Sequence, residues 1–181
     1  MRTRQPGLLL GEWAVLGVLA EQPAHGFAVA RRLEPGGDVG RAWSLSRPLT
    51  YRAVETLEAQ GLIEPVGEEP GIAGGRRRLL APTGRGRQQL ESWLRQPVAH
   101  LRDVRSELLL KLLLCGLAGA SSQPLVEAQL QAFAPLARKL AGEARRSPTD
   151  PVVLWRCESS RSVVRFLERL ARAGPTGRSP R

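Results

Sequence analysis

The chain has 181 residues and a formal net charge of +10, and 42% of its residues are hydrophobic. This length allows one domain of ordinary size or two small ones, and the hydrophobic share excludes an intrinsically disordered chain. The two cysteines are too few for a disulfide framework and lack zinc-binding spacing, which excludes a small secreted scaffold and a zinc module. The basic excess favours a polyanionic partner, most commonly nucleic acid, although codon bias alone could explain why nearly all basic residues are Arg.

Neither apolar segment of the sequence predicts a membrane helix. The N-terminal segment imitates a secretory signal, but Glu12 and Trp13 interrupt its apolar core. The apolar run over residues 108–117 contains Lys111, and it is far shorter than the roughly 20 residues that a membrane span needs. We therefore expect a cytoplasmic protein without a membrane partner.

Three helices are predicted first in the chain. Residues 8–21 form a helix that ends at Gln22-Pro23, and a second helix covers residues 25–33. A loop over residues 38–45 leads to Ser46, a good N-cap residue for a third helix that continues to Gln60. The apolar stripe of the third helix is expected to consist of Leu49, Ala53, Val54 and Leu57.

The hydrophobic period then changes. Residues 62–66 and 76–80 suit two short strands, and the Gly- and Pro-containing residues 67–75 between them suit a flexible hairpin tip. Thr83 is expected to cap a fourth helix that ends near Arg95.

The remaining chain predicts helices over residues 103–117, 124–145 and 151–172. Pro135 should kink the middle one or split it near residue 131. Both later helices carry apolar residues at the alternating spacing of a helix that packs on another helix. Residues 174–181 suggest a disordered tail.

The order helix, helix, helix, strand, basic loop, strand indicates a mainly α fold, in which a winged helix-turn-helix domain precedes a C-terminal helical dimerisation domain. We place the DNA-binding domain at residues 1–96, the helical domain at residues 97–173 and the tail at residues 174–181.

The sequence resembles the PadR family of bacterial transcriptional regulators. The similarity rests on residues 45–63, on Gly74-Gly75-Arg76-Arg77-Arg78 with Thr83 and Gly86, and on the turn at residues 23–27. Residues 104–112 resemble the start of the C-terminal helical domain of longer members. Departures occur at Leu79-Leu80, where relatives carry an aromatic residue, and at Pro82. The resemblance implies a DNA-binding regulator.

A winged helix places its third helix in the major groove and its hairpin on the flanking backbone. We therefore expect double-stranded DNA as partner, bound by arginines and hydroxyl groups of the third helix and by the basic end of the hairpin. A solvated helix face and a solubilising charge run are the competing interpretations. The candidate DNA-binding residues are Ser46, Arg47, Thr50, Tyr51, Arg52, Arg76, Arg77 and Arg78.

The C-terminal helices are expected to form a homodimer, because their apolar seams have no other surface to pack on in one short chain. The candidate dimerisation residues are Val126, Leu130, Phe133, Val164 and Leu167. Trp93 and Trp155 suit core or interface positions, or they stack on a ligand. Cys115 and Cys157 suit core positions, with a redox switch as the alternative.

The leading hypothesis is a homodimeric repressor that binds a palindromic operator. The resemblance adds a small aromatic effector that releases the DNA. A winged-helix adaptor that binds an acidic protein without sequence-specific DNA binding is the alternative. An enzyme is not expected, because we find no catalytic residues, no metal ligands and no cofactor motif.

Overall fold

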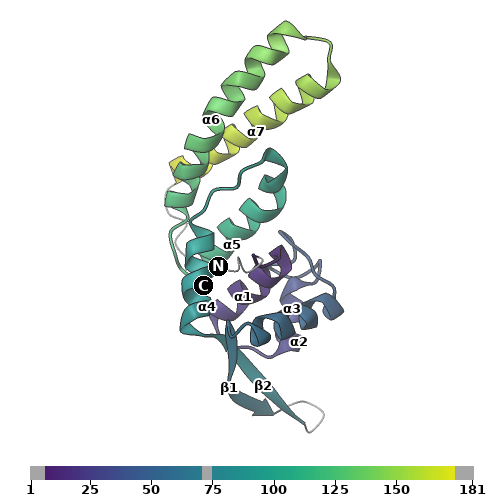
Figure 1. Cartoon of the computed structure of the whole chain (residues 1–181), viewed down its shortest axis with the longest axis vertical. Coiled ribbons are helices and arrows are strands. Elements are labelled where there is room, and N and C mark those ends of the chain that lie inside the picture. The colour runs from purple at the N-terminus through teal and green to yellow at the C-terminus, as the bar shows by residue number, and fades with distance from the viewer. Residues whose placement is uncertain (1–6, 71–74, 174–181) are drawn as a thin grey trace, which may run out of the picture. The chain divides into compact units, whose positions relative to one another are not determined.

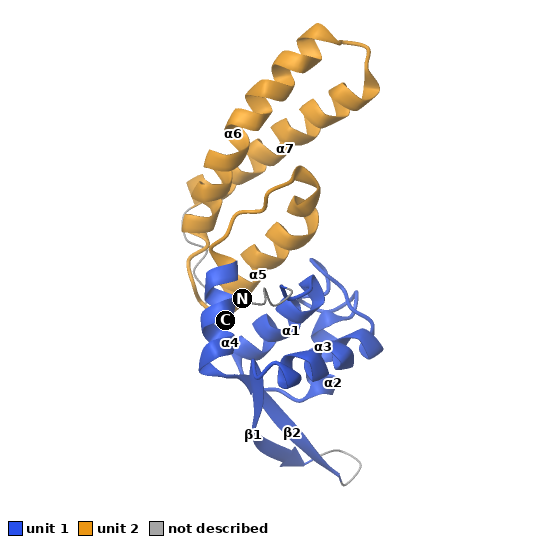
Figure 2. Cartoon of the chain, in the orientation of Figure 1, with its two compact units in different colours: residues 1–93 blue, residues 94–181 orange. Residues whose placement is uncertain are grey.

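The computed structural model describes residues 7–70 and 75–173 (Figure 1). The predicted tail, residues 174–181, and residues 71–74 of the predicted hairpin tip therefore lie outside the described residues. The chain divides into two compact units, residues 1–93 and residues 94–181, whereas the sequence suggested a division after residue 96 (Figure 2). The predicted fold class, a mainly helical winged helix-turn-helix with further C-terminal helices, is confirmed.

The first unit consists of three helices, a hairpin and a fourth helix. Its elements are α1 (Leu10–Glu21), α2 (Gly26–Leu33), α3 (Arg47–Ala59), β1 (Ile63–Pro70), β2 (Arg76–Pro82) and α4 (Gly84–Leu94). The core lies where α1, α2 and α3 pack on one another, and Leu16, Val29 and Leu57 are completely buried there. The hairpin extends from this core (Figure 1).

Gly61 ends the helix α3 and Thr83 caps the helix α4, as the sequence predicted. Gly61 adopts a φ of 65°, a left-handed conformation that glycine reaches at little cost, and it ends α3. The hydroxyl of Thr83 accepts a hydrogen bond from the N–H of Gly86 at 3.1 Å and donates one to the carbonyl of Gly61 at 2.9 Å. The predicted cap of α4 by Thr83 is thus confirmed, and it also ties α4 to the end of α3.

The hairpin is antiparallel and is held against the helices by a third short segment. Ile63 pairs with Pro82 and Pro70 with Arg76, with a bulge at Val66. Ala24 forms an isolated bridge with Leu80, in which both backbone N–H groups donate, at 3.1 and 3.0 Å. Because Ala24 directly precedes α2, this bridge fixes the start of α2 beside β2.

The second unit is helical. It contains a 3₁₀ turn (Leu101–Asp103), a π-helical turn (Val104–Leu108), α5 (Leu109–Leu117), α6 (Gln123–Arg146) and α7 (Pro151–Ala173). The predicted helix over residues 103–117 therefore begins as irregular turns. The predicted split near residue 131 is wrong, since α6 continues through Pro135. The helices α6 and α7 lie side by side (Figure 1).

Candidate nucleic-acid interface

The first two turns of α3 present an exposed polar surface. Ser46 occupies the N-cap position, where its carbonyl accepts a hydrogen bond from the N–H of Thr50 at 3.0 Å, but its hydroxyl makes no capping bond. Arg47, Tyr51 and Arg52 are exposed. Arg52 forms no ion pair with any residue that the structure describes. Its guanidinium group is therefore available to an external anion.

Thr50 does not belong to this surface, and the expectation that it contacts DNA is wrong. It is completely buried, and its hydroxyl donates a hydrogen bond to the carbonyl of Ser46 at 3.2 Å. The hydroxyl is thus satisfied by the backbone of its own helix, so its burial leaves no unpaired polar group. Leu49, which the sequence assigned to the apolar stripe, is 47% exposed instead.

The Phe27 ring contacts one arginine from α3 and one from the hairpin. The guanidinium carbon of Arg47 lies 5.0 Å from the centre of the Phe27 ring, and that of Arg77 lies 5.7 Å from it. Both distances are within the range of cation–π attraction. One exposed aromatic ring at the start of α2 therefore gathers an arginine from α3 and an arginine from β2 at the same surface.

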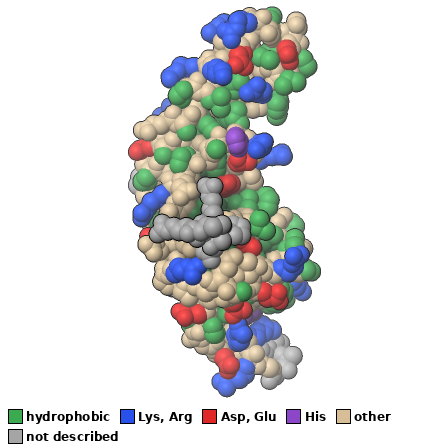
Figure 3. Space-filling view, viewed as in Figure 1, with side chains coloured by type: hydrophobic (Ala, Val, Ile, Leu, Met, Phe, Trp, Pro, Cys, Tyr) green, Lys and Arg blue, Asp and Glu red, His purple; other side chains and the backbone are tan. Residues whose placement is uncertain are grey.

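Each arginine of β2 has a defined neighbour in the described structure. Arg76 forms an ion pair with Glu68 of β1 at 2.8 Å, and Arg78 forms one with Glu58 in the last turn of α3. Figure 3 shows acidic and basic side chains next to one another over the hairpin. The basic run is therefore not an isolated cationic patch, as the sequence suggested, but part of a mixed-charge surface.

His25 connects α2 to both strands, a role that the sequence analysis missed. Its Nδ1 accepts the N–H of Ala28 at 3.1 Å and so caps α2. Because Nδ1 is an acceptor, the ring proton of neutral His25 lies on Nε2, which is 2.8 Å from a carboxylate oxygen of Glu69. Arg77 Nη1 lies 3.4 Å from the same nitrogen. A His directly before a helix is the signal that could have indicated this cap.

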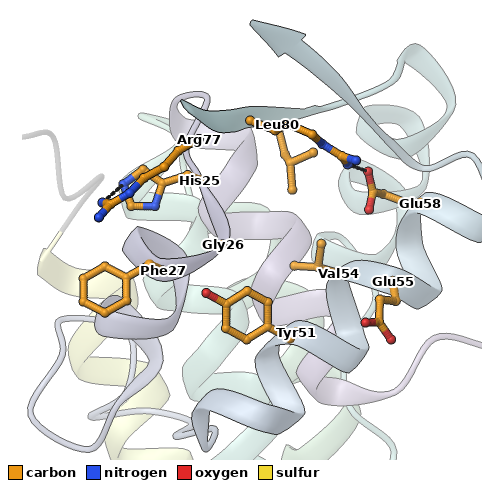
Figure 4. Close-up of a pocket in the computed structure, with 10 residues that line it drawn as sticks. His25, Gly26, Phe27, Tyr51, Val54, Glu55, Glu58, Arg77 and Leu80 are labelled. Carbon is orange, nitrogen blue, oxygen red and sulfur yellow. Dashed lines mark hydrogen bonds and ion pairs between the residues drawn. The ribbon is translucent and has the colours of Figure 1, made fainter. Parts of the chain in front are cut away.

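A groove of about 560 Å³ runs between the start of α2, the exposed side of α3 and β2. Figure 4 shows Tyr51 below Gly26, Arg77 beside His25, and Glu55 and Glu58 along α3. The groove is shallow and carries both charges, so it suits an extended charged partner better than a small apolar ligand.

Three of the five predicted dimerisation residues lie in the core of the second unit, which corrects the assignment of those three. Val126, Phe133 and Leu167 are almost completely buried within one chain. Leu130 and Val164 are partly buried and pack against the same cluster. The physical reason is that α6 and α7 pack their apolar seams on each other, so these seams need no second copy.

The two candidate ligand residues have different surroundings. Trp93 is buried and stacks on Trp13, with ring centres 4.7 Å apart, which is a core contact between α1 and α4. Trp155 at the start of α7 is 73% exposed. It lines a groove of about 820 Å³ together with Arg105 and Arg156.

Cys115 and Cys157 are buried, unpaired thiols. Burial raises the pKa of the Cys115 thiol. Within residues 7–70 and 75–173, no three His, Cys, Asp or Glu side chains form a group that could hold a metal ion. No helix in that part of the chain is both long and apolar enough to cross a membrane.

The solved structures that are similar to this chain include three with low sequence identity. Bacillus subtilis PadR in complex with operator DNA is 19% identical, covers 88% of this chain and 97% of its own, and has a TM-score of 0.45. The same protein in complex with p-coumaric acid is 20% identical, with coverages of 91% and 94% and a TM-score of 0.40. The Vibrio cholerae virulence activator AphA is 20% identical, with coverages of 90% and 96% and a TM-score of 0.41.

No curated protein sequence matches the chain. Residues 15–92 match the family model of the transcriptional regulator PadR-like family. The matched segment contains α2, α3 and the β1–β2 hairpin, together with nearly all of α4. The N-terminal unit of this chain is therefore similar to the transcriptional regulator PadR-like family over residues 15–92.

Proposed function

We propose that the protein is a DNA-binding transcriptional regulator that inserts α3 into the major groove and rests the β1–β2 hairpin on the neighbouring phosphates. The observation that carries this proposal is the shared surface at Phe27, where Arg47 of α3 and Arg77 of β2 converge. A helix that reads bases beside a strand that holds the backbone needs this convergence. The match of residues 15–92 to the model of a regulator family supports the same function.

Within this surface we assign separate roles to the two elements. Arg52 is exposed and free of a carboxylate partner in the described structure, so it is our first candidate for a guanine edge. Arg47 is the second, and Ser46 and Tyr51 suit phosphate contacts. Arg76, Arg77 and Arg78 hold the flanking backbone. The chain contains no Asn, so bidentate reading of adenine through Asn is excluded.

The proposal also covers the oligomeric state of the protein and the direction of its regulation. We propose a homodimer on a palindromic operator that acts as a repressor in the cytoplasm. Because Val126, Phe133 and Leu167 are buried within one chain, we propose that the dimer contact uses other residues. Val152 and Leu154 at the start of α7 are exposed apolar side chains and favour an interface there.

A small aromatic effector would fit the groove beside Trp155. The exposed indole offers a stacking surface, and Arg105 and Arg156 offer two cations for an acidic substituent. A titration with p-coumaric acid, followed by tryptophan fluorescence in the wild type, Trp155→Phe and Arg156→Gln, tests this assignment. Equal quenching in all three proteins would place the effector elsewhere.

The experiment that tests the function itself is a salt titration of binding to double-stranded DNA. A dimer that neutralises on the order of 8 phosphates should give a log–log slope of about −7. If no duplex binds even at low salt, the DNA function is wrong and the alternative, an adaptor for an acidic protein, becomes the better explanation. Selection from random DNA then shows whether the preferred site is a palindrome.

A further inference from the structure

Resting on the proposed DNA function, we propose that Glu58 is a built-in competitor of DNA: its carboxylate occupies the Arg78 guanidinium group, which a phosphate would otherwise take. The two residues are 20 positions apart in the sequence, and they come from the end of α3 and from β2. The Arg78 side chain is 56% exposed and the Glu58 side chain is 30% exposed. Solvent and a DNA phosphate can therefore both reach the pair.

The stability of α3 does not explain a carboxylate at this position. Glu58 lies in the last turn of α3, which contains no basic residue. The carboxyl end of a helix carries a partial negative charge, so an acidic side chain there is unfavourable for the helix. Its favourable interaction in the described structure is the ion pair with Arg78, together with the hydrogen bond that this pair contains.

The same arrangement recurs over the proposed DNA-binding surface. Arg47 is paired with Glu34 at 3.0 Å and Arg76 with Glu68 at 2.8 Å. The described hairpin residues, 63–70 and 75–82, include three Arg and three Glu, so their formal charges cancel. Glu58 differs from the hairpin glutamates because it links α3 to the hairpin, and DNA has to contact both of these elements.

The magnitude of the competition follows from the exposure of the pair. An exposed ion pair contributes little free energy in water, so a phosphate can displace Glu58, but the phosphate then gains less free energy from binding Arg78. The displaced carboxylate also stays close to the phosphate and repels it. Because this cost does not depend on base sequence, Glu58 should weaken binding to every duplex by a similar factor. Its effect is to shorten the residence of the protein on random DNA.

A double-mutant cycle tests this proposal. Binding of a fluorescently labelled duplex of random sequence is measured at fixed salt for the wild type, Glu58→Gln, Arg78→Gln and the double variant. We expect Glu58→Gln to bind about two- to fivefold more tightly per protomer, which corresponds to the loss of one exposed ion pair. In the Arg78→Gln background, the same substitution should lose most of this gain, because no guanidinium group is left to release.

Glu55→Gln is the matched control. Glu55 lies one turn earlier on α3, lines the same groove and forms no ion pair within the described residues. Removing its charge reports only long-range repulsion, so its effect should be the same with and without Arg78. The proposal is overturned if Glu58→Gln leaves the affinity unchanged, or if its gain persists in Arg78→Gln. A wild type that binds no duplex at all overturns the proposed function, and the competitor role with it.

Discussion

Gly26 and Tyr51 are in direct contact across the groove between α2 and α3. A Cβ atom at Gly26 would lie 2.8 Å from Cε1 of Tyr51, which is closer than real Cβ contacts allow. The missing side chain of Gly26 therefore determines where the Tyr51 ring can lie (Figure 4). Since Tyr51 is 42% exposed on the proposed DNA-binding surface, this contact links the start of α2 to DNA recognition.

Gly26→Ala should reduce DNA affinity with little loss of stability. The added methyl group displaces the Tyr51 ring, which can swing into solvent because it is only half buried. The gain in helix propensity, at most about 1 kcal/mol, offsets part of the strain. Gly84→Ala is the control, because Gly84 also begins a helix and a Cβ there meets nothing within 4 Å. Equal duplex affinities for the two variants, measured by fluorescence anisotropy, would remove Tyr51 from the interface.

Asp38→Asn should lower the stability of the N-terminal unit in a pH-dependent way. Arg32 donates hydrogen bonds to both carboxylate oxygens of Asp38 and one to Glu21, and its hydrogen bonding lowers the pKa of Asp38. A carboxyl group whose pKa is lower in the folded state stabilises the fold above its unfolded pKa, and this contribution is lost as the pH falls through the folded pKa. At neutral pH the loss should be about 0.5–1 kcal/mol, since Asp38 is half exposed.

Denaturant unfolding at neutral pH and at about pH 3 tests whether the stability lost in Asp38→Asn decreases as the pH falls. The difference between Asp38→Asn and the wild type should shrink at the lower pH, because a carboxyl group whose pKa is lowered by folding contributes less stability below its unfolded pKa. Glu64→Gln serves as the control, because Glu64 is an exposed carboxylate that forms no ion pair with any described residue. A difference that stays constant over the pH range would show that the Arg32 contact does not act through the charge of Asp38.

Sequence alone predicted the order and type of most elements because local signals mark their ends. Pro23, Gly61 and Thr83 stop or start helices through their own backbone and hydroxyl chemistry, so no tertiary information was needed. The orientation of α3 was predicted less well. Thr50 lies four and seven residues before Val54 and Leu57 and so shares their face, whereas Leu49 lies at its edge. The sequence analysis chose Leu49 for its hydropathy. The hydrogen bond of the Thr50 hydroxyl to the Ser46 carbonyl lets the polar residue be buried there.

The pairing of charges could not be predicted, because the partners are distant in the sequence. Glu58 and Arg78 meet only after the hairpin has folded back on α3. For the same reason, the seams of α6 and α7 looked like an intermolecular interface. Val126 and Leu167 lie more than 40 residues apart, and periodicity alone does not tell whether such residues pack within one chain or between two.

Gln129→Leu should destabilise the C-terminal unit. The completely buried Gln129 side chain accepts the N–H of Val98 at 2.7 Å and donates to its carbonyl at 3.0 Å. Leucine has a similar size but leaves both backbone groups of Val98 unpaired, at a cost of about 1–3 kcal/mol for each buried group. Gln129→Glu keeps the acceptor but loses the donor and buries a carboxylate, so at neutral pH it should be at least as destabilising as Gln129→Leu. Thermal unfolding of the three proteins should place the wild type highest and Gln129→Glu no higher than Gln129→Leu.

Leu167→Asp should unfold the C-terminal helices rather than separate two intact protomers. Leu167 is completely buried within one chain, and an unpaired carboxylate there costs about 3–5 kcal/mol. Val152→Asp changes an exposed residue of the same helix, so it should leave helicity intact and weaken a dimer that uses the start of α7. Circular dichroism and sedimentation separate these effects. A folded Leu167→Asp monomer would return the interface to the α6–α7 seam.

Arg52→Ala and Arg76→Ala should differ in how they affect sequence preference. Arg52 lies free on the exposed side of α3, and a guanine contact there is worth about 1–3 kcal/mol of discrimination. We therefore expect Arg52→Ala to weaken binding to the selected operator while binding to a scrambled duplex changes little. Arg76 is highly exposed on β2 and suits a phosphate, so Arg76→Ala should weaken binding to both duplexes.

The salt dependence separates these two roles independently of affinity. Loss of one phosphate contact lowers the log–log slope by about 1, whereas loss of a base contact leaves the slope unchanged. Arg87→Ala is a suitable control, because Arg87 is an exposed arginine of α4 outside the proposed surface. The assignment of α3 to the major groove fails if Arg52→Ala behaves like Arg87→Ala on both duplexes. The opposite pattern, a relaxed base preference in Arg76→Ala, would make the hairpin the reading element.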